Sequence, residues 1–159
     1  RNSEGRYYNI NFGFGKINAY KMMNIGKTWQ KLPKNKQIRI TKYPNEMIME
    51  NTYEFKITNG DIEHIEHVQV WLSIQRNNQY IYDLELNILS PNNTSIDCFN
   101  SDGKDQSIKA KYASINEFPF LAECFRGEKS KGVWSIKLRD DNINTSMYLS
   151  KIELVIDGY

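Results

Sequence analysis

Apolar and polar residues alternate with a period of two along much of the chain after residue 50. The apolar positions fall in five runs, at residues 53–57, 68–74, 84–88, 134–138 and 152–156. Strict alternation puts one face of a strand on an apolar core and leaves the other face wetter. Turn signals such as Asn59-Gly60-Asp61 separate the runs. Many strands without intervening helices predict an all-β jelly-roll sandwich or barrel.

The beginning of the chain has a different pattern. Residues 1–12 are polar and predict a surface loop, whereas residues 16–29 predict one short α-helix. Its apolar stripe has spacings of three and four, at Ala19, Met22, Met23, Gly26 and Trp29. A helix of this length is marginal in water, so we expect Met22, Met23 and Trp29 to dock on another surface. The Pro-containing stretch 32–36 is the predicted linker between helix and strands.

Composition limits the classes of function. The 159 residues are 40% hydrophobic and carry a formal net charge of +2, with acidic and basic residues interspersed. A folded domain is expected, and nucleic-acid binding is not, because that function calls for a clustered basic excess. No apolar run approaches the roughly 18–20 residues that span a bilayer, so the chain predicts no membrane segment.

Two cysteines, Cys98 and Cys124, allow a single disulfide in a secreted domain or two buried free thiols in a cytosolic one. We predict the disulfide. Without histidines at ligand spacing the pair does not make a zinc site. Residues 98–125 are otherwise too weakly patterned to assign strands.

Three further groups of residues invite a chemical interpretation. His64 and His67 are three apart on a predicted strand, where their side chains point to opposite faces, so strand-edge histidines are favoured over a catalytic or metal pair. Residues 140–144 offer oxygen ligands but lack a full calcium-binding loop, which favours a solvated turn. Trp71 and the aromatics at 80–82 could form an exposed sugar-binding platform. We favour the alternative that they cover a core or pack against a neighbouring domain.

The Asn-x-Ser/Thr acceptor pattern for N-glycosylation occurs three times, at Asn92, Asn93 and Asn144. Because Asn92 and Asn93 are adjacent, at most one of them is expected to carry a glycan.

Five segments together resemble one protein family. Residues 11–19, Asn-Phe-Gly-Phe-Gly-Lys-Ile-Asn-Ala, resemble the end of a subtilisin-type catalytic domain. Residues 65–70, 83–94, 126–140 and 148–158 resemble, in order and spacing, the strands and hairpins of the P domain of kexin- and furin-like proprotein convertases. The chain departs from the family at Phe125-Arg126, where a Trp usually precedes Gly-Glu. The carboxylate of Glu128 in this motif either satisfies turn amides or is solvated.

The resemblance implies two parts: residues 1–33 as the C-terminal segment of a catalytic domain, and residues 34–159 as the P domain. It further implies a non-catalytic stabilising or regulatory role, with the upstream catalytic domain of the same polypeptide as partner. The parent would be a secreted or secretory-pathway serine endopeptidase, cleaving after basic residues. The family's Gly-Thr-Ser-x-Ala nucleophile motif does not occur here, and no cofactor is expected in this chain, although the parent catalytic domain could bind calcium.

Two other functions fit part of the pattern. A free-standing jelly-roll module could bind carbohydrate or another ligand, and would then show an exposed concave aromatic patch with convergent polar groups. A P domain could also be joined to a different class of enzyme, but the tail-like residues 11–29 argue against this.

Overall fold

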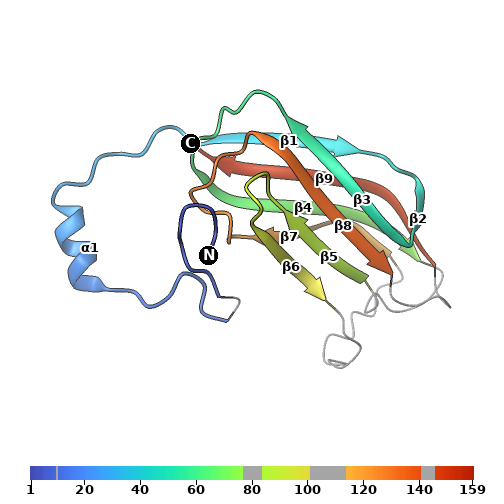
Figure 1. Ribbon diagram of the computed structural model, residues 1–159, viewed down its shortest axis with the longest axis horizontal. Helices are drawn as coiled ribbons and strands as arrows, with labels where there is room; N and C mark the ends of the chain where they lie inside the picture. The colour runs from blue at the N-terminus through green and yellow to red at the C-terminus, as the bar shows by residue number, and fades with distance from the viewer. Residues whose placement is uncertain (10, 77–83, 101–113, 141–145) are drawn as a thin grey trace.

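Two antiparallel sheets pack face to face in the computed structural model, which describes residues 1–9, 11–76, 84–100, 114–140 and 146–159 (Figure 1). The first sheet has the order β1-β9-β4-β7, with β2 also paired to β9, and the second has the order β3-β8-β5-β6. The strands are β1 Lys36–Lys42, β2 Glu46–Ile48, β3 Glu50–Ile57, β4 Ile65–Arg76, β5 Leu84–Leu89, β6 Ser95–Asn100, β7 Ser114–Ala122, β8 Gly132–Asp140 and β9 Met147–Gly158. The predicted all-β sandwich is confirmed.

The core lies between the two sheets, and the alternation in the sequence accounts for it. Inward-facing residues of β3 and β8, such as Phe55, Trp134 and Ile136, are fully buried, and their neighbours in the strand are more exposed. All five alternating runs lie within strands, namely β3, β4, β5, β8 and β9. Burial of large aromatic and branched side chains in this layer supplies the main driving force for folding.

Strand β9 departs from the prediction, because both of its faces are buried from Ile152 to Gly158. Glu153, Val155 and Asp157 were expected on the wetter face, yet each is buried. β9 lies between β1 and β4, so side chains from both neighbours cover it. Arg39 and Thr41 of β1 contact the Glu153 carboxylate.

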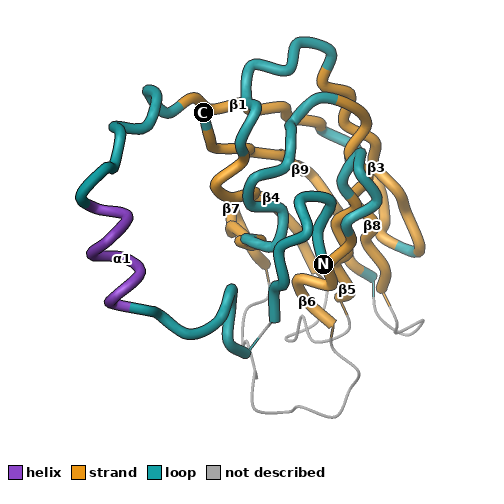
Figure 2. The backbone as a smooth tube through the Cα atoms, turned by 60° about the vertical axis from the view of Figure 1, so that its left-hand side comes forward, coloured by secondary structure: helices purple, strands orange, loops and turns teal. Residues whose placement is uncertain are grey.

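The helix α1, Ala19–Gly26, is shorter than the predicted 16–29. The side chain of Asn18 accepts a hydrogen bond from the Lys21 N–H at 2.9 Å, which caps the first turn and fixes where the helix begins. All of its residues are exposed, and it stands away from both sheets (Figure 2). The predicted linker is also shorter, because Lys36 already pairs with Gly158 at the start of β1.

Both ends of the chain lie at the same end of the sandwich (Figure 1). The segment that carries α1 leaves this end after residues 1–9 and returns to it at β1. The turn between β5 and β6 and the loop before β8 gather there as well. This end of the sandwich therefore brings together the motifs that the sequence singled out.

Candidate functional site

The carboxylate of Glu128 joins two motifs that are far apart in the sequence. Its side chain is 0% exposed and accepts a hydrogen bond from Ser90 Oγ at 2.9 Å and another from Thr94 Oγ1. Ser90 and Thr94 flank the turn between β5 and β6, and Glu128 lies in the loop between β7 and β8. A buried carboxylate needs such donors to offset its loss of solvation. Of the two alternatives for Glu128, the solvated carboxylate is therefore excluded.

The same loop is anchored in the core by two aromatic rings. Phe125 and Trp134 are fully buried and meet edge to face, with ring centroids 5.1 Å apart and an interplanar angle of 76°. Trp134 donates its Nε1–H to the Ser130 carbonyl at 2.8 Å, so its one polar atom is satisfied. At the departure from the family motif, Phe125 enters the core and Arg126 is exposed. The loop that carries Glu128 is therefore held at a fixed position.

The first six residues contact this loop, although the sequence predicted a surface loop there. Asn2 is only 7% exposed, and its Nδ2 donates to the carbonyls of Cys124 at 2.9 Å and Arg126 at 3.0 Å. The backbone N–H of Ser3 donates to Glu128 Oε1 at 3.0 Å and to Thr94 Oγ1 at 3.2 Å. Residues 1–12 are mostly polar, and this composition is typical of a surface loop, so the sequence does not predict these contacts. No pattern in the sequence indicates that an isolated asparagine will be buried.

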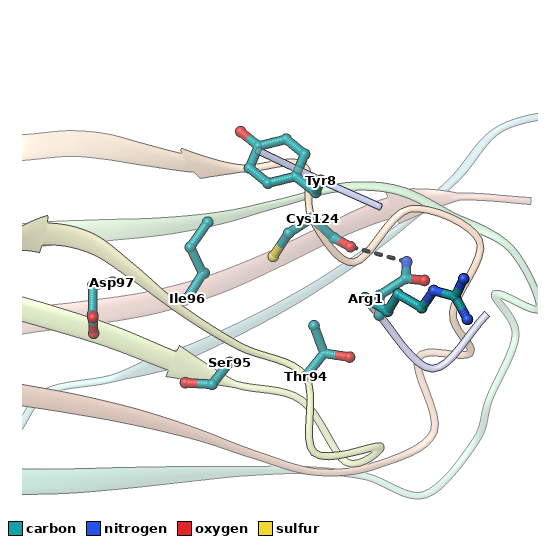
Figure 3. Close-up of a pocket in the computed structure, with 8 residues that line it drawn as sticks. Arg1, Tyr8, Thr94, Ser95, Ile96, Asp97 and Cys124 are labelled. Atoms are coloured by element: carbon teal, nitrogen blue, oxygen red, sulfur yellow. Dashed lines mark hydrogen bonds between the residues drawn. The ribbon is translucent and has the colours of Figure 1, made fainter. Parts of the chain in front are cut away.

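A cavity of about 340 Å³ lies beside this contact (Figure 3). It is lined by Arg1, Asn2, Tyr8, Thr94, Ser95, Ile96, Asp97 and Cys124. Figure 3 shows Tyr8 and Cys124 on one side and Thr94 and Ser95 on the other. Burial raises the pKa of the Tyr8 hydroxyl, and nearby Glu123 and the two thiols raise it further. The cavity therefore presents a protonated phenol and hydroxyl groups rather than an activated nucleophile.

Both cysteines are free thiols in the structure, and the Cys98–Cys124 disulfide stays a prediction. Cys98 lies on β6, whereas Cys124 follows β7 in the other sheet. Burial raises the pKa of each thiol to about 12. Protonated thiols in an apolar setting behave as small hydrophobic side chains, and both belong to or pack against the core.

The two histidines have different partners, so they do not act as a pair. His67 Nε2 lies 3.1 Å from Asp157 Oδ2 on β9, and the His64 ring lies 5.3 Å from the Tyr159 ring. Within the part of the chain that the structure describes, no group of three or more His, Cys, Asp or Glu side chains could hold a metal ion. Residues 141–144, part of the weak calcium candidate, lie outside the described residues.

Trp71 lies on β4, within the first sheet. It is half-buried, and its Nε1–H donates to Gln69 Oε1 at 2.9 Å. The aromatics at 80–82 lie outside the described residues.

The candidate glycosylation sites differ in what the structure describes. Asn92 and Asn93 are exposed in the turn before β6, so both are accessible, whereas Asn144 lies outside the described residues. Glycosylation of these sites stays a prediction.

The predicted docking residues are all exposed. Met22 is 61% exposed, Met23 is 69% and Trp29 is 61%. Other large apolar side chains of the same segment are also exposed: Tyr7, Phe12, Phe14, Ile17, Tyr20, Ile25 and Leu32. Single exposed apolar residues are ordinary on a protein surface, whereas here many occur together within residues 7–32. We call it the apolar segment.

Comparison with known families decides where the chain belongs. The family model described as the proprotein convertase P-domain matches residues 65–156, which is more than half of the chain. The chain belongs to this family. The match runs from the start of β4 almost to the end of β9 and includes the Ser90–Thr94 turn, Glu128 and Trp134.

The P domain has similar sequences in animals. It is 25% identical over 150 residues to the PC3-like endoprotease variant B of Hydra vulgaris, covering 89% of this chain and 20% of that protein. It is 25% identical over 157 residues to the furin-like protease 1, isoform 1-CRR, of Drosophila melanogaster, covering 96% of this chain and 13% of that protein. The chain thus spans a fifth or less of these two relatives.

A solved structure shares the fold. The serine protease of Aeromonas sobria superposes with a TM-score of 0.79 at 20% sequence identity, covering 100% of this chain and 33% of that protein. The superposition supports the arrangement of the strands. No helix in the part of the chain that the structure describes is long and apolar enough to cross a membrane.

Proposed function

We propose that this chain is the non-catalytic P domain, with the terminal segment of the catalytic domain, of a secretory-pathway serine endopeptidase of the subtilisin family. Its role is to hold the upstream catalytic domain folded. The catalytic Ser, His and Asp, any calcium ion and the cleavage specificity for basic residues belong to that upstream part. The relatives are proteases several times longer than this chain, which supports an additional domain in the parent protein.

The exposed apolar segment carries the proposal. Met22, Met23 and Trp29 are hydrophobic side chains on or beside a helix that has only eight residues and no buried position. An isolated helix of this length is unstable in water, so it needs a surface to cover its apolar side chains. The resemblance of residues 11–19 to a catalytic-domain tail supports the rest of the catalytic domain as that surface.

The test compares this chain with a longer polypeptide that includes the upstream domain. Hydrogen exchange of the β3 and β8 amides reports the stability of the sandwich in both. A partner that contacts only the folded form raises its stability, so exchange should be slower and the melting temperature higher in the longer polypeptide.

Trp29→Ala tests the role of the apolar segment in this coupling. It should reduce the gain in melting temperature of the longer polypeptide. It should leave the melting temperature of the shorter chain unchanged, because Trp29 is exposed there. Tyr43→Ala is the matched control, since Tyr43 is 67% exposed but lies outside the apolar segment. Equal stability of both polypeptides, with no effect of Trp29→Ala in either, would contradict the proposal.

A further inference from the structure

The apolar segment is attached to the sandwich at both of its ends. On one side, residues 2–6 fold onto the loop that carries Glu128. On the other side, Lys36 begins β1, an edge strand of the first sheet, and pairs with Gly158 at the end of β9. Between these attachments, residues 27–35 are all exposed and make no strand.

The first attachment is specific in its chemistry. Asn2 uses both faces of its amide: Nδ2 donates to two loop carbonyls, and Oδ1 accepts from the N–H of Glu4 at 3.2 Å and of Arg6 at 3.0 Å. The second pair of bonds closes the peptide into a turn that presents the Ser3 N–H to Glu128. An aspartate or alanine at position 2 could not supply the same donors.

Two further contacts add to this attachment. The Arg6 guanidinium passes over Gly127 so closely that a Cβ there would lie 2.9 Å from Arg6 Nε. Tyr8 packs against the core cluster beside Cys98 and Cys124. Removing this peptide would leave the buried Glu128 carboxylate and two loop carbonyls short of donors, which makes its release costly.

We propose that Glu128 and the carbonyls of Cys124 and Arg126 form a receptor for the Asn2–Arg6 turn, which holds the upstream part of the protein to the P domain without help from the connecting backbone. We call this receptor with its bound turn the Asn2 latch. Cutting the chain within residues 27–35 then leaves the two parts associated. The identity of the upstream part as a catalytic domain rests on the proposed function, whereas the latch itself does not.

The experiment uses the 159-residue chain with a recognition sequence for a site-specific protease inserted between Pro33 and Lys36. After cleavage, native mass spectrometry and size-exclusion chromatography measure how much of the N-terminal piece remains bound. We expect the two pieces to elute together. Separation of the cleaved wild-type pieces at micromolar concentration would overturn the latch.

Asn2→Ala should raise the dissociation constant of the cleaved pieces at least about tenfold, because it leaves two loop carbonyls without donors. Asn11→Ala is its control, since Asn11 is exposed in the same segment. Glu128→Gln should weaken the association as well, with Glu54→Gln, on the exposed face of β3, as control. If Glu128→Gln does not fold, the comparison of Asn2→Ala with Asn11→Ala still tests the latch. Equal dissociation constants for these two variants would refute it.

The outcome is separable from that of the proposed function. If the latch holds but the upstream domain does not stabilise the sandwich, the proposed function fails and the latch stands. If the upstream domain stabilises the sandwich but the cleaved pieces separate, the coupling is made by the apolar segment, and the latch is wrong.

Discussion

The ring of Pro91 lies directly against the backbone of Gly132. A Cβ built on Gly132 would lie 2.5 Å from the Cβ of Pro91, and Gly132 has φ +133°, a conformation that residues with a side chain rarely adopt. Pro91 belongs to the turn before β6, and Gly132 opens β8. This contact therefore joins the family motifs at residues 83–94 and 126–140, in addition to the hydrogen bonds of Glu128.

Gly132→Ala should destabilise the P domain by at least about 2 kcal/mol, because it adds both backbone strain and a clash with a rigid ring. Chemical denaturation measures the change in the free energy of unfolding. Gly26→Ala is the control, since no heavy atom lies within 4 Å of a Cβ at that helix position. A change below 0.5 kcal/mol for Gly132→Ala would show that the turn gives way at little cost.

Phe125→Ala should cost about 3–5 kcal/mol, because it opens a cavity against Trp134 in the fully buried core. Phe118→Ala should cost much less, since Phe118 on the edge strand β7 is half exposed. Denaturant unfolding of both variants checks the difference. Similar losses for the two phenylalanines would contradict the assignment of Phe125 to the core.

The two thiols should make the protein less stable at alkaline pH. Their pKa is raised from 9.0 to about 12 in the folded state, so the unfolded chain releases these protons first. The contribution of the two protonated thiols to the free energy of unfolding is fully present below pH 9. It is lost as the pH rises from 9 towards 12. The double variant Cys98→Ala, Cys124→Ala should lower this slope of unfolding free energy against pH. An unchanged slope would contradict the raised pKa values.

Glu153 should contribute to stability at neutral pH and lose that contribution in acid. Burial alone would raise the pKa of this carboxylate, but the hydrogen bond from Thr41 and the charges of Arg39 and Lys151 outweigh it and hold the pKa below 4.5. The contribution is therefore present above pH 4.5 and disappears as the pH falls through the lower folded-state value.

The measurement for Glu153 is the free energy of unfolding between pH 6 and pH 3. Glu153→Gln should flatten its dependence on pH in this range. The control is Glu54→Gln, on an exposed position of β3. If both variants keep the wild-type slope, Glu153 does not titrate as described.

The strands with strict alternation could be predicted because one face of each is buried. β3, β5 and β8 follow this rule, since they belong to a sheet with one wet side. β1 could not be predicted, because its apolar residues are few, and the predicted linker overlaps its first residue, Lys36. β7 was not assigned, since it is an edge strand whose exposed Phe118 and Leu121 break the alternation.

The candidate site could be predicted only as separate motifs. The resemblance singled out Ser90, Thr94 and Glu128, but their meeting depends on how two sheets stack, which local patterns do not determine. Asn2 was missed because a buried asparagine depends on partners more than a hundred residues away. The predicted boundary after residue 33 stays a prediction.

The position of β9 has a consequence for how the protein is made. β9 follows every other described strand in the sequence and lies between β1 and β4, so the first sheet lacks a central member until β9 has been synthesised. β1 pairs with β9 and has no other neighbour in the described sheet order, so it must wait until β9 emerges from the ribosome. Such long-range pairing folds slowly, and during that interval β4 exposes an open apolar edge. Premature termination before β9, at Met147, would therefore leave a chain with an unpaired β1 and β4 that is prone to aggregation.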